Sequence, residues 1–181
     1  MILRPLRPED MEAVARLHAA SWASAYRGLL RDDYLDGPVH DERLALWRRR
    51  RDEPAPGQLG VVAESSDGLQ GFAFAIIGRD PRWGTLLDNL HVRADYRSRG
   101  LGRQLLHALC AALAQAGATG GLYLEVLDGN QRARRFYERL GGIAVHGGLG
   151  RLPDGSQLPE WVYAWPSIAA LQAATAAPEP A

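Results

Sequence analysis

The chain has 181 residues, which favours one domain with a single core. Hydrophobic residues make up 46 % and charged residues 23 %, and the 21 Lys and Arg residues are balanced by 21 Asp and Glu residues, so the overall charge gives no support to nucleic-acid binding. The single cysteine, Cys110, excludes an internal disulfide and any metal site built from several cysteines. Because no apolar stretch is long enough for a signal peptide or a membrane span, we expect a cytoplasmic protein without membrane or nucleic-acid partners.

Hydrophobic periodicity along the chain predicts strands that alternate with amphipathic helices. Alternating or short apolar runs predict strands at residues 1–6, 59–64, 69–78, 85–92, 120–127, 142–148 and 160–165. Apolar residues at three-to-four spacing predict helices at 7–26, 41–49, from about 103 onward, and at 130–141. This pattern indicates an α/β domain with one central sheet over residues 1–166. An Ala- and Pro-rich tail follows at 167–181, which we expect to be frayed or weakly helical.

The helix expected from about residue 103 begins in an unusual way, within the stretch RSRGLGRQLLHALC at residues 97–110. No Ser, Thr, Asp or Asn stands where it could cap the first backbone N–H groups. Arg99 and Arg103 flank the positive end of the helix dipole, where cations are unfavourable. Glycines before a helix let a ligand approach the backbone closely, and the free N–H groups and the dipole attract phosphate. The stretch therefore indicates a phosphate site. The alternative is a tight turn whose arginines are solvated.

Two common phosphate-binding motifs do not fit this stretch. A Walker loop requires G-x-x-x-x-G-K-[ST], which the chain does not contain. A dinucleotide-binding turn requires a third small residue at position 105, where the chain has Leu105. The predicted phosphate site is therefore of another type.

Two stretches of the chain together resemble a known family. In the first, Arg97, Gly100 and Gly102 match the phosphate-loop pattern R/Q-x-x-G-x-G/A. The second lies on the helix after the next strand, where the matching residues are Asn130, Ala133, Phe136, Tyr137, Leu140 and Gly141. Through these stretches the chain resembles the GCN5-related N-acetyltransferases (GNAT). The resemblance implies a GNAT-like acyl-CoA acyltransferase fold, with a single mixed central sheet and helices on both of its faces, and acetyl-CoA as co-substrate without a metal.

The same resemblance implies which residues hold acetyl-CoA. The strand before the loop is expected to pair its backbone with the pantetheine arm, and the loop is expected to bind the pyrophosphate. An asparagine at the start of the second motif is expected to tie its side chain to the strand end or to the cofactor arm. The implied cofactor-binding residues are Leu90, His91, Val92, Arg97, Ser98, Arg99, Gly100, Leu101, Gly102, Arg103, Asn130 and Ala133.

Acetyl transfer from a thioester to an amine requires a base for the amine proton and benefits from an acid for the departing thiolate. Tyr137 stands where family members carry the acid, with packing on the sheet as its alternative role. Glu125 interrupts an apolar strand, where a lone carboxylate is costly unless it is paired or used. Its spacing to Tyr137 resembles that of family members that acetylate a protein N-terminus, so we expect it to be the base. The alternative bases are Asp88 and a water relay. The alternative role of Glu125 is an ion pair with an arginine of the next helix.

We therefore expect an acetyl-CoA-dependent N-acetyltransferase whose acceptor is a small-molecule amine or a peptide N-terminus. The alternative is a regulatory domain that binds CoA or acyl-CoA without turnover. The oligomeric state is not predicted, and a homodimer is one option. The arginines at 48–51 are expected to form a solvated helix end, with recruitment of an acidic substrate as the other reading. Trp22, Tyr26 and Trp47 are expected to be core residues, of which some line the acceptor pocket.

Overall fold

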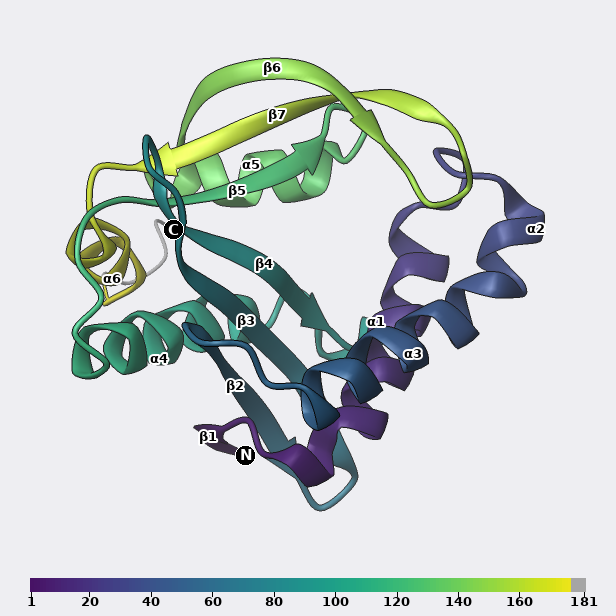
Figure 1. The fold of residues 1–181 in the computed structure, drawn as a ribbon, viewed down its shortest axis with the longest axis horizontal. Helices are drawn as coiled ribbons and strands as arrows, with labels where there is room; N and C mark the ends of the chain where they lie inside the picture. Colours follow the sequence, from purple (N-terminus) through teal and green to yellow (C-terminus); the bar gives the residue numbers. More distant parts are fainter. Residues whose placement is uncertain (177–181) are drawn as a thin grey trace.

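The computed structural model describes residues 1–176, in which seven strands form one mixed sheet with helices on both faces (Figure 1). The strands lie in the order β1-β2-β3-β4-β5-β7-β6, and every neighbouring pair is antiparallel except β4 and β5, which are parallel. Their bounds are β1 Ile2–Pro5, β2 Gln58–Ser65, β3 Gly68–Asp80, β4 Gly84–Val92, β5 Leu122–Leu127, β6 Ile143–Arg151 and β7 Gln157–Trp165. The expected fold class, a single mixed sheet covered on both faces, is confirmed.

The helices are placed by the alternation of side chains along the strands. Val62, Phe72 and Phe74 point to one face of the sheet and pack against α1 and α3, whereas the neighbouring positions Ala63 and Ala73 point to the other face and pack against α4. The bounds are α1 Met11–Ala25, α2 Asp32–Leu35, α3 Pro38–Asp52, α4 Leu101–Gln115, α5 Gln131–Arg139 and α6 Ile168–Ala176, with 3₁₀ turns at Pro8–Asp10 and Ala94–Tyr96. No helix of the described residues is long and apolar enough to cross a membrane.

The sheet opens between its two parallel strands. β4 and β5 are paired only at Thr85 with Leu122 and at Leu86 with Tyr123, and beyond these pairs the two strands diverge toward their carboxyl ends (Figure 1). Asp88 is the extra residue of a bulge, because its neighbours Leu87 and Asn89 pair with consecutive residues of β3. The divergence leaves a gap in the middle of the sheet, bordered by β4 on one side and β5 on the other.

Glycines hold the closed end of this gap together. A Cβ atom added to Gly84 would lie 2.3 Å from the carbonyl oxygen of Gly121, closer than any real contact. Gly84 also has a φ of 88°, which L-residues rarely adopt. The two backbones can therefore approach each other at the base of β4 and β5 only because both residues lack side chains.

The carboxyl-terminal segment at 167–181 was expected to be frayed or weakly helical, and its described part is a helix packed on the domain. Residues 168–176 form α6, and the side chains of Ile168, Leu171 and Thr175 are buried where the helix packs on α4. Of the two alternatives the helical one applies to residues 168–176, because burial of these side chains stabilises a segment whose Ala-rich composition alone predicts fraying. The Pro-containing part of the expected tail, residues 177–181, lies outside the described residues.

Candidate active site

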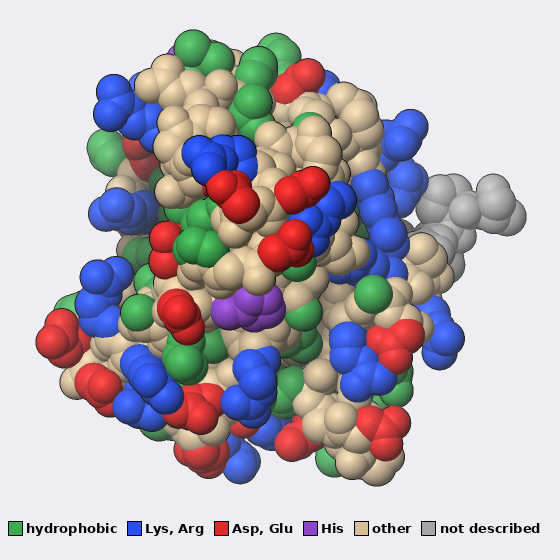
Figure 2. All heavy atoms as spheres, turned by 90° about the vertical axis from the view of Figure 1, so that its right-hand side faces the viewer, with side chains coloured by type: hydrophobic (Ala, Val, Ile, Leu, Met, Phe, Trp, Pro, Cys, Tyr) green, Lys and Arg blue, Asp and Glu red, His purple; other side chains and the backbone are tan. Residues whose placement is uncertain are grey.

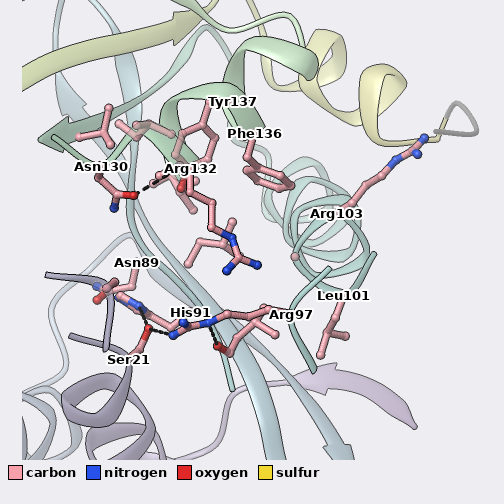
Figure 3. A pocket seen from close by; sticks show the side chains of 18 of the residues that line it. Ser21, Asn89, His91, Arg97, Leu101, Arg103, Asn130, Arg132, Phe136 and Tyr137 are labelled. Carbon is pink, nitrogen blue, oxygen red and sulfur yellow. Dashed lines mark hydrogen bonds between the residues drawn. The ribbon is translucent and has the colours of Figure 1, made fainter. Parts of the chain in front are cut away.

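A cavity of about 460 Å³ occupies the gap between β4 and β5 and extends to the start of α4 (Figure 3). All of the predicted cofactor-binding residues except Arg99 line it, as do Tyr137 and Glu125. A second cavity of about 420 Å³ continues from it toward α1, α3 and the β6–β7 turn. The residues that line both cavities are Tyr26, Asp88, Asn89, His91 and Glu125. The two cavities therefore form one continuous site with two ends.

The loop before α4 has the backbone conformation of an anion-binding turn. Ser98 has a φ of 60° and Gly100 a φ of 77°, and Gly100 immediately precedes the helix without a side-chain cap. The first helical hydrogen bond at this end runs from the Gln104 amide to the Gly100 carbonyl, so the amides before it have no helical carbonyl to bond. Only Gln104, at 4.0 Å, lies near the position of a Gly100 Cβ, so conformation rather than space requires this glycine.

Arg97 lies in the cavity without a carboxylate partner among the described residues. Its guanidinium donates to the Ser24 hydroxyl over 2.9 Å and to the Val92 carbonyl over 3.1 Å. Burial lowers the pKa of Arg97, and the charge of Arg132 lowers it further. Arg132 in turn donates to the Ser98 hydroxyl over 3.2 Å. Two cations that meet only hydroxyls and carbonyls at the foot of an uncapped helix fit the phosphates of a coenzyme.

The other two arginines of the loop lie differently. The Arg103 Nε donates to the carbonyl of Thr175 in α6 over 2.8 Å, and Figure 3 shows the side chain turned away from the cavity toward that helix. Arg99 is exposed, with its guanidinium 5.5 Å from the centre of the Tyr96 ring. Their predicted roles at the phosphate rest on the resemblance, whereas Arg132 is a cation that the sequence analysis did not assign to the cofactor.

A polar chain connects the loop to the second cavity. The Ser21 hydroxyl lies 2.9 Å from Nδ1 of His91 and 3.4 Å from Nη2 of Arg97. The His91 ring stacks at 4.5 Å on His18, whose Nδ1 accepts a hydrogen bond of 3.0 Å from Trp47. Burial lowers the pKa of His91 to about 3 and holds the pKa of His18 well below its usual range. Both imidazoles are therefore neutral at neutral pH and cannot serve as cations in the site.

Tyr137 reaches from α5 into the cavity beside Phe136 (Figure 3). Its side chain is 9 % exposed, and burial, followed by the charge of the nearby Tyr26 phenol, raises its pKa. Asn130 holds the start of α5 by accepting a hydrogen bond of 3.2 Å from the Ala133 amide. Tyr137 is consequently a fixed phenol that keeps its proton at neutral pH.

The two candidate bases differ in their partners. Glu125 is the one exposed side chain of an otherwise buried strand, and no ion pair of this carboxylate occurs within residues 1–176. The expected burial of Glu125 is wrong, because its side of β5 faces the cavity. Asp88 accepts a hydrogen bond of 2.7 Å from Arg50 and another from the Asn89 amide. The unpaired carboxylate of Glu125 is therefore the one free to take a proton.

The second cavity brings charged side chains of α3 to the site. Arg50 is 11 % exposed and Arg43 is 13 % exposed, and both line this cavity. Figure 2 shows acidic, basic and histidine side chains mixed on this face of the molecule. The expected solvated run at 48–51 is therefore wrong for Arg50, although Arg48 and Arg49 are exposed.

Sequence reasoning missed several residues of the site that come from α1 and α3. Ser21 and Ser24 share the cavity-facing side of the end of α1, while Arg43 and Arg50 are seven residues apart on α3 and so project from the same face. Trp22 and Tyr26 line the second cavity, whereas Trp47 is fully buried, as expected of a core residue. Helical spacing from the buried Trp47 was the signal that could have identified the two arginines.

Among residues 1–176, no group of three or more His, Cys, Asp or Glu side chains is arranged to hold a metal ion. The structure is similar to several solved acetyltransferase structures. One is a GCN5-related N-acetyltransferase from Rhodopseudomonas palustris, with a TM-score of 0.70 and 24 % identity over 91 % of this chain and 94 % of that one. Another is the PaiA N-acetyltransferase of Thermoplasma acidophilum in complex with coenzyme A, with a TM-score of 0.63 and 20 % identity over 88 % and 96 %. A third is YncA of Salmonella typhimurium with acetyl-CoA, with a TM-score of 0.65 and 20 % identity over 92 % and 93 %.

No curated protein matches the chain. The profile of the acetyltransferase (GNAT) family, by contrast, matches residues 15–142, well over half of the sequence. That range contains the uncapped start of α4, both strands that border the gap, and Tyr137 of α5. The chain therefore belongs to the acetyltransferase (GNAT) family.

Proposed function

We propose that the protein is an N-acetyltransferase that moves the acetyl group of acetyl-CoA directly to a primary amine. The observation that carries this proposal is the continuous cavity, which has uncapped amides and two unpaired arginines at one end and a buried phenol in its wall. Solved structures of the same fold that contain coenzyme A or acetyl-CoA support it.

The coenzyme is expected to lie along the open edge of β4. The amides of residues 98–102, with Arg97 and Arg132, hold the pyrophosphate, because this is where free N–H groups and cations without carboxylate partners meet. The backbone of residues 90–92 binds the pantetheine arm, since β5 has already diverged from β4 at this point. Asn130 and Ala133 contact the arm from the start of α5.

Acetyl-CoA supplies the acetyl group as a thioester, whose carbonyl carbon is attacked by the amine nitrogen as the carbon–sulfur bond breaks. Glu125 takes the proton of the incoming ammonium, directly or through a water, so that the nitrogen has a lone pair. Tyr137 gives its proton to the departing sulfur, and a phenol with a raised pKa is fully protonated for this step. The nitrogen loses its second proton as the amide forms, and this proton restores the phenol through solvent. The gap between β4 and β5 holds both groups along the same cavity.

Two measurements test the proposal together. Calorimetry is expected to show acetyl-CoA binding, and saturation at 100 times Kd stabilises a folded protein by about 2.7 kcal/mol, which raises Tm. Release of free thiol from acetyl-CoA in the presence of a panel of primary amines, with the acetylated amine identified by mass spectrometry, tests turnover. Binding without turnover across the panel would support a coenzyme-binding regulatory domain, and absence of binding would overturn the proposal.

A further inference from the structure

The second cavity is lined by acidic and basic side chains from the sheet and from α3. The sheet supplies Asp88 from β4, Glu125 from β5 and Glu160 from β7. The helical wall supplies Arg43 and Arg50 from α3, and Arg151 at the end of β6 adds a third cation. His18 of α1 and His91 of β4 also line this cavity as neutral rings, because burial lowers the pKa of each. Three carboxylates and three guanidiniums thus line a cavity whose formal charges cancel.

This balance excludes one class of acceptor and favours another. A polycationic amine is bound best where carboxylates outnumber cations, and this cavity offers no such excess. Charges that are equal in number, where they are not already paired with one another, are complementary to a molecule that carries both signs. The wall of α3 is then the place to look for an anion-binding group.

Arg50 is already paired. Its guanidinium donates to Asp88 over 2.7 Å and lies on the Trp47 and Phe74 rings, 4.7 and 4.4 Å from their centres. Arg50 therefore fixes the position of Asp88 through a short ion pair, although its buried Nη1 has no hydrogen-bond partner within residues 1–176.

Arg43 is in a different situation. It lies 4.5 Å from the centre of the Trp22 ring, and its nearest carboxylate oxygen, on Glu42, is 3.6 Å away, beyond hydrogen-bond distance. That same oxygen accepts a hydrogen bond of 2.6 Å from the Tyr34 hydroxyl. The Nε of Arg43 is buried and has no hydrogen-bond partner within the described part of the chain. A guanidinium that is 13 % exposed, stacked and poorly paired is suited to bind a carboxylate through two parallel hydrogen bonds.

The sheet side of this cavity is suited to an ammonium group. Glu125 and Glu160 lie diagonally on adjacent strands, since Glu125 pairs with Val162 and Glu160 with Leu127. Burial raises the pKa of Glu160, and the charge of Glu125 raises it further. A cation between the two carboxylates relieves this repulsion.

We infer that the acceptor is an amine that also carries a carboxylate, as a free amino acid does, with its carboxylate bound by Arg43 and its amine on the side of Glu125. This inference rests on the proposed function, because it assigns the second cavity to the acceptor. It separates the candidates by chemistry: free amino acids and similar zwitterions fit, whereas polyamines and peptide N-termini lack a carboxylate next to the amine.

The first test compares acceptors with the wild-type protein. Each common L-amino acid is offered beside its carboxamide, which keeps the amine and the side chain but removes the negative charge, and spermidine serves as a polycation. For the preferred amino acid, kcat/KM is expected to exceed that of its carboxamide by about 10- to 100-fold, the usual range for losing hydrogen bonds to a charged group. Equal or faster acetylation of carboxamides or spermidine would overturn the inference and leave the proposed function intact. No acetylation of any amine would overturn both.

The second test assigns the carboxylate to one residue. Arg43→Gln is expected to raise KM for the amino acid by about 10- to 100-fold while leaving KM for its carboxamide unchanged. Arg43→Lys, which keeps the charge without the planar fork, should have an intermediate effect. Arg49→Gln is the matched control, because Arg49 is exposed on the same helix outside both cavities. If Arg43→Gln raised both KM values equally, the carboxylate would not be bound at Arg43.

Discussion

Glu125 and Asp88 border the same cavity from the two diverging strands, yet their surroundings prepare them for different roles. Asp88 is held by Arg50 and Asn89, so its position is fixed and its lone pairs are engaged. Glu125 projects from β5 with no ion-pair partner among the described residues. A base must have a free lone pair within reach of the substrate, which favours Glu125.

Exchange of each carboxylate for its amide separates these roles. Glu125→Gln keeps the shape but cannot take a proton, so kcat is expected to fall about 100-fold near pH 7. It should recover partly at high pH, where the amine arrives already deprotonated. Asp88→Asn should change kcat much less, although it weakens the contact with Arg50. A pH profile of kcat for both variants checks this, and a larger loss in Asp88→Asn would move the base to β4.

Tyr137 can be tested without disturbing its packing. Tyr137→Phe keeps the ring and removes only the hydroxyl, so kcat should fall by about 10- to 100-fold, as is usual for one acid–base group. The Kd for acetyl-CoA should stay near that of the wild type, because the loop at residues 97–103 is untouched. Steady-state kinetics and calorimetry check the two expectations, and an unchanged kcat would leave Tyr137 a packing residue.

At the scale of single residues, the sequence predicts a site residue where a short motif specifies it. It does not predict a residue whose place in the site depends on how a helix is rotated about its axis. The positions of Gly100 and Tyr137 follow from short patterns that specify backbone conformation and residue type. Arg50, in contrast, belongs to a run of four arginines that looks uniform in sequence. Only the phase of α3, set by burial of Trp47, turns Arg50 inward and Arg49 outward.

Among the elements, α4 begins with a left-handed residue and without a helix cap, and both features lower the stability of the helix unless a ligand compensates. Gly100 has a φ of 77°, and the helix that follows lacks a cap. The same chain contains a comparable glycine, Gly117, just after α4, with a φ of 76° and no atom within 4 Å of an added Cβ. The two positions carry similar backbone strain but lie at opposite ends of the helix.

This pair allows strain and ligand binding to be separated. Gly100→Asp and Gly117→Asp should each lower the free energy of unfolding by about 1 to 2 kcal/mol, because an L-residue is forced into the left-handed region. Only Gly100→Asp should also weaken acetyl-CoA binding, by at least about tenfold, since it places a negative charge where the phosphates approach. Calorimetric Kd values and urea unfolding check this, and equal Kd values for the two variants would remove the phosphate site from the start of α4.

The elements themselves were largely predictable, because seven strands and the longer helices show clear periodicity. α2 was not expected, since its four residues lie in a polar stretch too short to show a period. α6 was expected to be frayed or weakly helical because its composition is Ala-rich, and its stability comes from packing on α4 rather than from its own pattern. The divergence of β4 and β5 likewise has no signal in hydrophobicity, because it depends on a bulge and on two glycines.

For the molecule as a whole, the buried His18 and the half-buried His91 make stability depend on pH. The folded state lowers the pKa of His91 from 6.5 to about 3, so between these values the unfolded chain binds a proton that the folded chain does not. The stabilisation is therefore complete above pH 6.5 and is lost as the pH falls below it, by up to about 1.4 kcal/mol per pH unit for each such histidine. His18 acts in the same direction.

Urea unfolding at pH 7.5, 6.0 and 5.0 checks this expectation in a range where carboxylates stay largely ionised. His91→Gln should flatten the dependence, because one group that differs in protonation is removed. His40→Gln is the matched control, since His40 is exposed on α3 and should leave the slope as in the wild type. An unchanged slope in His91→Gln would show that His91 stays accessible to protons in the folded state.

The sheet is joined across its middle by only two residue pairs between β4 and β5, while α6 leaves β7 and packs on α4 behind the gap. Mechanically, the molecule has two halves, β1–β4 and β5–β7. They are held together by this short pairing, by α6 on α4, and by Leu127 of β5 and Leu158 of β7, which pack against α2 and α3. One half can unfold before the other. A spectroscopic probe placed in each half therefore need not report the same unfolding curve. A coenzyme bound between the two halves would contact both and make them unfold together. Ligand binding would then change the cooperativity of the transition as well as its midpoint.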